Sequence, residues 1–220
     1  MKLFYFGHSC FKLEFARNAV VVTDPFTGVG YEMPTITADI VTCSHQHFDH
    51  NFTQRVSCNR TPIGSSGSYS FFAENGTLLV EGIDCFHDEQ KGALRGNNVI
   101  FKFTYGNLVL CHMGDIGEPP SDKLISQIGK VDVLMIPVGG TYTVDARWAR
   151  EYVEKLSPSV VIPMHYKFGT CNLDIAGVDE FTELSGRYTV ERGGQSIEIN
   201  KEQLSEKTKK IIVMAGACNE

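Results

Sequence analysis

The sequence predicts an α+β fold in which two β-sheets pack face to face and helices lie outside them. Short apolar or alternating segments at close spacing dominate the first half of the chain, which is typical of strands. In the second half, apolar strands alternate with helices. Because the apolar face of a sheet must be buried, these elements favour stacked sheets with helices on the outside.

The expected strands are apolar or alternating segments between turn-forming residues. They cover residues 3–6, 11–15, 20–23, 39–43, 99–104, 108–111, 131–136 and 160–163. Tyr105-Gly106-Asn107 separates two of them, and its Gly and Asn suit the positive φ of a tight hairpin turn.

Two helices are expected in the second half. Val144, Trp148, Tyr152 and Leu156 repeat every fourth residue, and Ser157-Pro158 ends this helix. A shorter helix covers 122–128, after Pro119-Pro120-Ser121 and before Gly129. The charged segment 201–210 is expected to be a solvated surface, with a helix as one alternative.

Length and composition favour one domain over residues 1–220. Of the 220 residues, 42% are hydrophobic and 21% charged, which is typical of a packed enzyme-like domain. The net charge of −6 supplies no broad attraction for nucleic acid. The seven cysteines lack a Cys-x-x-Cys spacing, which indicates reduced, mostly buried thiols. Without a secretory pattern or a run of ~20 apolar residues, a cytoplasmic protein is expected.

The most informative segment is Ser-His-Gln-His-Phe-Asp-His-Asn, which starts at Ser44 directly after an apolar strand. It places four potential ligands within six residues: His45, His47, Asp49 and His50. Imidazole and carboxylate together suit zinc, iron, manganese or related divalent metals. Close alternation cannot direct all four side chains to one ion without strain, whereas a loop can divide them between two ions. A metal-scavenging histidine tract would need neither the aspartate nor the strand.

Three more positions complete the expected site. His87 follows a further predicted strand at 82–86, and Asp115 and His165 follow the predicted strands at 108–111 and 160–163. Loops at one edge of a sheet converge while the strands stay rigid, so ligands are commonly placed there. The remaining histidines of the chain are His8 and His112.

These motifs together resemble the metallo-β-lactamase superfamily, and within it the L-ascorbate-6-phosphate-lactonase-like branch of zinc-dependent hydrolases. The similar stretches span nearly the whole chain. They are Gly7-His8-Ser9-Cys10-Phe11, Thr23-Asp24-Pro25-Phe26, Ser44 to Asn51, Phe86-His87-Asp88-Glu89, Arg95-Gly96-Asn97-Asn98, Cys111-His112-Met113-Gly114-Asp115, Ile136-Pro137-Val138-Gly139-Gly140-Thr141-Tyr142-Thr143 and Pro163-Met164-His165-Tyr166.

The resemblance implies a four-layer αββα sandwich with two mixed sheets, helices outside and two divalent metal ions at one edge. Zn²⁺ is favoured, with Mn²⁺, Ni²⁺ or Fe²⁺ as alternatives. By match to the family pattern, the first metal is bound by His45, His47 and His87. The second is bound by Asp49, His50 and His165, and Asp115 bridges the two.

Other residues are expected to orient ligands or touch substrate. His112 is an alternative to His87 as the third ligand of the first metal. If the strand continues as far as Asp115, however, His112 and Asp115 lie on opposite faces of it, because side chains alternate along a strand. This favours His87 as the ligand. His112 and His8 are therefore placed outside the ligand set, with a polar core histidine as the alternative for each. Asp24 resembles the family's aspartate that supports the histidine loop, with a plain turn aspartate as the alternative. Gln46 stands where relatives commonly carry an acidic residue, and it is expected to point away from the metals.

The expected activity is metal-dependent hydrolysis of a small ester, lactone or phosphoester by a bridging hydroxide. Two metals lower the pKa of a bound water from ~15.7 toward ~7. Asp49 and Asp115 are the expected catalytic carboxylates, because they position the ions and can accept a proton. The loop 88–96 is expected to be flexible and to contact substrate. Its Lys91 and Arg95, together with Lys167, point to an anionic substrate, with ordinary surface solvation as the alternative.

Two other functions remain open at this stage. The superfamily includes tRNA-processing nucleases, although the chain shows no basic run beside the site and nucleic acid is therefore a disfavoured partner. The same ligands can also hold iron in a redox protein. A small-molecule partner is expected, no membrane partner is expected, and homo-oligomerisation is left open.

Overall fold

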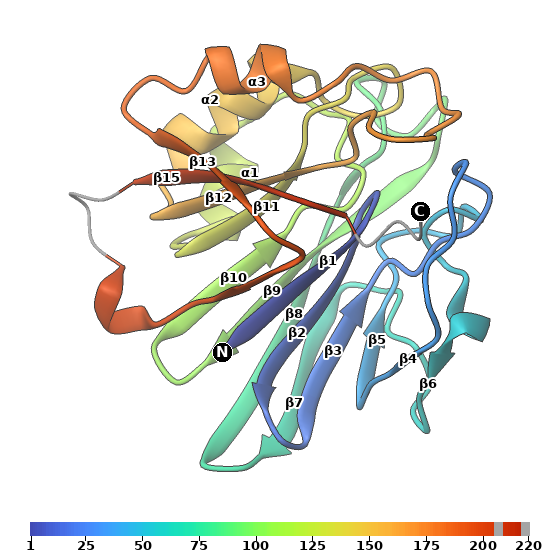
Figure 1. Cartoon of the computed structure of the whole chain (residues 1–220), viewed down its shortest axis with the longest axis vertical. Helices are drawn as coiled ribbons and strands as arrows, with labels where there is room; N and C mark the ends of the chain where they lie inside the picture. The colour runs from blue at the N-terminus through green and yellow to red at the C-terminus, as the bar shows by residue number, and fades with distance from the viewer. Residues whose placement is uncertain (205–208, 217–220) are drawn as a thin grey trace.

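Two β-sheets face each other in the computed structural model, which describes residues 1–204 and 209–216 (Figure 1). The smaller sheet has five strands in the order β14-β1-β2-β3-β5. Their bounds are β1 Lys2–Gly7, β2 Cys10–Ala16, β3 Ala19–Thr23, β5 Ile40–Thr42 and β14 Ser196–Glu198. The β3–β5 pair is parallel and the other neighbours are antiparallel, so this sheet is mixed.

The larger sheet has eight strands in the order β13-β15-β12-β11-β10-β9-β8-β7. The bounds are β7 Gly67–Ala73, β8 Gly76–Phe86, β9 Asn97–Tyr105, β10 Leu108–His112, β11 Val133–Pro137, β12 Val160–Met164, β13 Thr189–Gly193 and β15 Lys210–Met214. From β10 to β13 all neighbours are parallel. The carboxyl ends of β10, β11 and β12 therefore share one edge.

The space between the sheets is filled by a large apolar cluster. Strand β1 alternates buried and half-buried residues, so Leu3 and Tyr5 enter this core. Strand β11 is buried throughout because it is covered on both faces. Its Met135 faces the inter-sheet core, whereas Leu134 packs under the helices.

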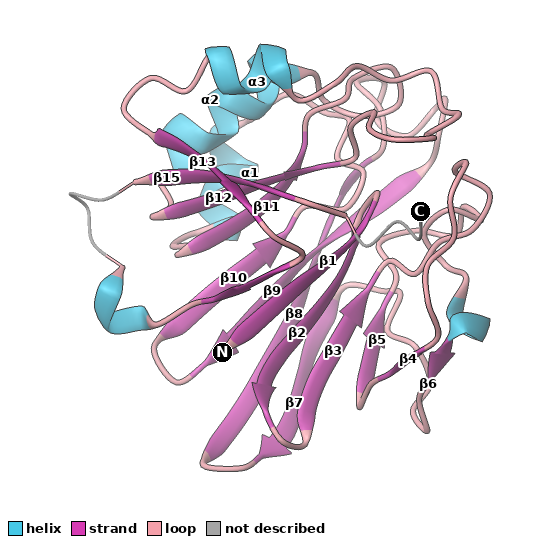
Figure 2. Ribbon diagram, in the orientation of Figure 1, coloured by secondary structure: helices cyan, strands magenta, loops and turns pink. Residues whose placement is uncertain are grey.

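Three helices cover the outer face of the eight-stranded sheet (Figure 2): α1 Asp122–Ile128, α2 Ala146–Leu156 and α3 Asp179–Glu183. Helix α1 begins where the Ser121 side chain accepts a hydrogen bond from the backbone of Leu124. Asp145 caps α2 in the same way, so Val144 precedes the helix although the fourfold repeat includes it.

The outer face of the five-stranded sheet has a different covering. There, Val22 and Val41 pack against loop residues such as Phe26 and Met33. The small pair β4 Ile36–Thr37 and β6 Val56–Ser57, with the 3₁₀ turn η1 Thr53–Arg55, completes this layer. Among the described residues no α-helix lies on this side. The sandwich is confirmed, and its layer on this side consists of loops and short elements.

Most expected elements are present within one or two residues of their predicted ends, and 122–128 matches α1. In the predicted hairpin turn only Gly106 has a positive φ, of 60°. The sequence did not predict α3 or the strands β4, β6, β7, β13, β14 and β15, and of β8 it predicted only residues 82–86. Of the segment 201–210, residues 201–203 form the 3₁₀ turn η2 Lys201–Gln203, residue 210 starts β15, and 205–208 lie outside the described residues. No helix in the described ranges is long and apolar enough to cross a membrane.

Candidate metal centre

All the predicted ligands meet at the edge where β5, β8, β10 and β12 end. His87 directly follows β8, and His165 directly follows β12. The loop after β5 carries His45, His47, Asp49 and His50, and Asp115 follows β10.

The side chains form three overlapping groups, within each of which the potential ligand atoms lie within 4.8 Å of one another. One group is His45, His47 and His87, as expected for the first metal. Another is His8, Asp49, His50 and His165, which contains the ligands expected for the second metal and adds His8. The last is His45, His50 and Asp115, which joins the other two groups. The structure thus brings the seven predicted ligands together, while their binding of metal stays a prediction.

Asp115 lies at the centre of this arrangement. Its Oδ2 is 3.1 Å from Nε2 of His50, 3.1 Å from Nε2 of His165 and 3.5 Å from Nε2 of His87. Burial opposes ionisation, but His165 and His50 hold the pKa of Asp115 well below its usual range. The residue is therefore a buried carboxylate that can contact both metal positions.

Asp24 orients two of the histidines, His50 directly and His45 through Ser44. Its fully buried carboxylate accepts hydrogen bonds from the Ser44 backbone at 2.8 Å, the Ser44 hydroxyl at 2.5 Å and Nδ1 of His50 at 2.8 Å. Since the Ser44 hydroxyl donates to Asp24, its oxygen can accept from Nδ1 of His45, 3.0 Å away. This network places a proton on Nδ1 of both histidines, so Nε2 of each ring is the nitrogen left to bind a metal. Burial raises the pKa of Asp24, but His112 and His50 lower it further, so the carboxylate stays ionised.

His112 has no free ring nitrogen for a metal. Its Nε2–H donates to the Ser9 carbonyl at 2.8 Å, and its Nδ1 accepts from the Gly114 backbone at 3.2 Å. It belongs to none of the three groups. This placement agrees with the preference for His87 as a ligand.

The donor set fits metal ions. Among the described residues, only six buried side-chain nitrogen or oxygen atoms lack a hydrogen-bond partner, and four of them belong to the groups. These four are His45 Nε2, His87 Nδ1, Asp115 Oδ1 and His165 Nδ1. Buried polar atoms without a partner are costly, so Nε2 of His45 and Oδ1 of Asp115 are candidates for contact with a bound cation. The two Nδ1 atoms belong to rings whose Nε2 faces Asp115 instead. In addition, Nε2 of His50 lies 3.1 Å from Oδ2 of Asp115. Burial lowers the pKa of His50, but Asp115 and Asp24 raise it well above its usual range, so a proton on His50 satisfies this contact in the metal-free protein and a metal would replace that proton.

A cavity of about 360 Å³ opens beside the centre. Its lining includes five of the predicted ligands, the apolar or aromatic side chains Phe48, Tyr142 and Leu173, and the cation Arg95. Arg95 donates to the Thr141 carbonyl at 3.0 Å, and its guanidinium lies 5.5 Å from the centre of the Tyr142 ring. Of the three cations expected near substrate, only Arg95 lines this cavity. Lys91 is exposed elsewhere on the loop, and Lys167 lines a different hollow beside β13 and β15.

The loop 88–96 is more ordered than its sequence predicts. The buried Asp88 carboxylate accepts four backbone hydrogen bonds, from Gln90, Gly92, Leu94 and Arg95, at 2.7 to 3.0 Å. Burial raises the pKa of Asp88, but these bonds lower it further. The expectation of a flexible loop was therefore wrong, because one side chain supplies an internal scaffold that holds Arg95 at the cavity.

Several residues of the site escaped the sequence analysis. Asp88, Phe48, Tyr142 and Leu173 were given no role, although all but Leu173 lie in the stretches that carry the family resemblance. An aspartate followed by a Gly-rich loop is the signal that identifies a side chain-to-backbone scaffold. Gln46 is exposed, and its side-chain oxygen accepts a hydrogen bond from Asn51 at 3.1 Å, in agreement with the expectation that it points away from the metals.

Comparisons with known proteins agree with this fold and site. The family model described as the beta-lactamase superfamily domain matches residues 2–165, so the chain is a member of that superfamily. A solved structure from Thermotoga maritima, described as a proposed Zn-dependent hydrolase of the metallo-beta-lactamase superfamily, is 35% identical with a TM-score of 0.78, and the match covers 97% of each chain.

Two relatives identify the family within this superfamily to which the chain belongs. A UPF0173 metal-dependent hydrolase from Carboxydothermus hydrogenoformans is 30% identical over 213 residues, covering 83% of this chain and 91% of the relative. Another from Desulforamulus reducens is 30% identical over 198 residues, covering 76% and 84%. The chain belongs to the UPF0173 metal-dependent hydrolase family.

Proposed function

We propose that this hydrolase cleaves a small ester, lactone or phosphoester substrate with a dinuclear metal centre. The observation that carries the proposal is the pair of histidine groups connected by the group that contains Asp115, with five of the predicted ligands lining one cavity. His45, His47 and His87 would hold the first ion; Asp49, His50 and His165 would hold the second. Nitrogen and carboxylate donors favour Zn²⁺, with Mn²⁺, Ni²⁺ or Fe²⁺ as alternatives.

The protein's own groups have distinct tasks in this proposal. When bound, the ions lower the pKa of a shared water and polarise the substrate oxygen. Asp115 and Asp49 carry negative charge into the centre and can accept the proton of the attacking water. Asp24 keeps the Nε2 lone pairs of His45 and His50 directed inward.

The cavity supports a small substrate that carries one anionic group. Its volume of about 360 Å³ is in the range of small-molecule sites. Arg95 offers the charge, while Phe48, Tyr142 and Leu173 offer apolar contact. A phosphorylated lactone, which the resemblance to the L-ascorbate-6-phosphate-lactonase-like branch suggests, combines the scissile ring with such an anion. The net charge of −6 disfavours nucleic acid.

The test is metal quantification followed by a hydrolysis panel of lactones, phosphodiesters and thioesters. We expect two ions per chain and a fall of about 100-fold or more in kcat/KM for His47→Ala, since ligand loss exceeds the effect of losing a supporting residue. Gln46→Ala is the control, because its side chain lies in the same loop but outside the three groups. Equal turnover by His47→Ala and wild type would reject the site. Bound iron with oxygen consumption on thiols, without hydrolysis, would favour the redox alternative.

A further inference from the structure

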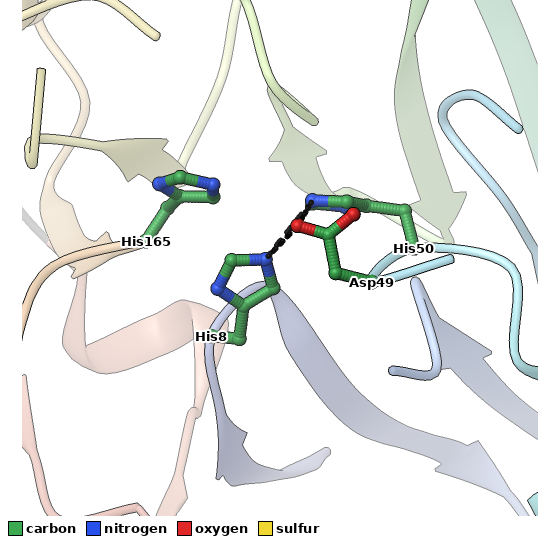
Figure 3. Close-up of side chains that lie close together, drawn as sticks. All are labelled: His8, Asp49, His50 and His165. Carbon is green, nitrogen blue, oxygen red and sulfur yellow. Dashed lines mark hydrogen bonds and ion pairs between the residues drawn. The ribbon is translucent and has the colours of Figure 1, made fainter. Parts of the chain in front are cut away.

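His8 lies in the turn between β1 and β2, far in sequence from the predicted ligands, yet its ring joins them (Figure 3). Its Nε2 is 3.0 Å from Nε2 of His50 and 3.3 Å from Oδ2 of Asp49. Its ring centre is 4.2 Å from that of His165. All four side chains have mutually close donor atoms, and His8, His50 and His165 are at most 1% exposed.

The backbone of His8 is built to hold this position. Its φ of 51° lies in the left-handed region, which a histidine adopts at a cost of order 1 kcal/mol. Three hydrogen bonds fix it there: the His8 N–H donates to the Tyr31 hydroxyl, and the His8 carbonyl accepts from the Tyr5 hydroxyl and the His165 N–H. A strained backbone that three hydrogen bonds hold in place indicates that the position of the His8 ring is important for function.

Hydrogen bonding accounts for these contacts in the metal-free protein but not once a metal is bound. Asp24 accepts from Nδ1 of His50, so Nε2 of His50 is a lone pair when a metal binds there. His8 can donate to that lone pair only when no metal uses it. Once a metal does, His8 retains only Asp49 at 3.3 Å, which is long for an N–H···O bond.

The distances match a common coordination sphere. A metal about 2.1 Å from each donor places neighbouring donors about 3.0 to 4.2 Å apart. The separations of His8 from His50 and Asp49, and of His50 from Asp49 at 3.7 Å, all lie in that range.

We infer that His8 is a direct ligand of the second metal position, together with Asp49, His50 and His165. The inference rests on the dinuclear centre proposed above and makes its two halves unequal. The second position has four protein ligands besides Asp115, and the first has three histidines, of which His47 is exposed. Ligands of both positions line the cavity, His47 and His87 from the first and Asp49 and His165 from the second. The extra ligand makes the second position the one held more tightly.

The test is NMR of protein labelled with ¹⁵N-histidine and loaded with ¹¹³Cd²⁺, in which direct ligation gives a ¹⁵N–¹¹³Cd coupling. We expect coupling on six of the seven histidines, with His112 as the internal uncoupled control. Two bound Cd²⁺ ions with His8 uncoupled, while His50 and His165 are coupled, would overturn this inference and leave the dinuclear centre intact. Fewer than two bound ions would overturn the dinuclear centre and this inference with it.

Two variants separate ligation from mere positioning. His8→Gly keeps the left-handed backbone without strain and removes only the ring, so the metal-free protein should fold normally. It should lose one coupling and bind the second ion at least about 10-fold more weakly. His8→Gln restores an N–H donor for Asp49 but provides no imidazole ligand. We expect it to be as weak as His8→Gly, and recovery of wild-type affinity by His8→Gln would show a positioning role instead.

Discussion

Asp24→Asn should weaken both metal positions, although Asp24 is predicted to bind neither ion. The wild-type carboxylate has two oxygens for three donors: one accepts from the Ser44 N–H, the other from the Ser44 hydroxyl and from His50 Nδ1. Asparagine has only one acceptor oxygen and adds an NH₂ donor. The NH₂ group of the asparagine then points either at the Ser44 N–H or at Nδ1 of His50. In both cases two hydrogen-bond donors face each other.

Each outcome has a cost that can be estimated. An unpaired buried donor costs about 1–3 kcal/mol of folding stability in the metal-free protein. If the NH₂ faces His50 instead, the ring avoids the clash by moving its proton to Nε2, which removes the lone pair needed by the second metal. The Ser44 hydroxyl also loses its acceptor, so the tautomer of His45 is no longer fixed for the first metal. Changes to such supporting groups typically cost 10–100-fold in metal affinity, or about 1.4–2.7 kcal/mol per ion.

Metal affinity is measured by competition with a chromophoric chelator, and stability by thermal unfolding of the metal-free protein. Asp132→Asn is the matched control, because Asp132 is also buried and accepts a backbone N–H, from Val109, but lies outside the three groups of the centre. We expect its metal affinity to equal that of the wild type. If Asp24→Asn retained wild-type affinity for both ions, the assignment of histidine tautomers through Asp24 would be wrong.

Three further changes test other parts of the structure. Arg95→Ala should raise KM about 10-fold or more for anionic substrates and little for neutral ones, whereas Lys167→Ala should affect neither; equal changes for both substrate types would refute the anion contact. Asp88→Ala should lower the melting temperature and raise KM, because four backbone N–H groups lose their acceptor, and an unchanged KM would show that the loop does not position Arg95. Burial raises the pKa of half-buried Glu118, so its stabilising effect is present at low pH and is lost as pH rises through the folded pKa. The melting temperature of metal-free Glu118→Gln should therefore rise relative to that of the wild type as pH increases above about 4.3, the ordinary pKa of glutamate, and a constant difference would contradict this.

Local patterns were sufficient for much of the fold and for the central ligands. The apolar strands and the fourfold repeat of α2 are short-range signals, and so is the run of ligands that starts at His45. Strand β7 was missed because its residues are mostly exposed or half-buried at the sheet edge, where no alternation of burial is required. The position of His8 depends on a backbone hydrogen bond to His165, 157 positions further on (165 − 8), and no local pattern reports such a contact.

The centre lies across both sheets, so inter-sheet packing sets its geometry. The five-stranded sheet carries His8, Asp24 and the loop that contains His45 to His50, while the eight-stranded sheet carries His87, Asp115 and His165. Two backbone hydrogen bonds join these halves at the centre, from His165 to the His8 carbonyl at 2.8 Å and from Val99 to the Ser44 carbonyl at 2.8 Å. Because close-packed interiors transmit small displacements, a cavity in the shared core would shift one half of the ligand set relative to the other. The large apolar core between the sheets therefore stabilises the fold and also affects catalysis, because it sets the distances between the ligands.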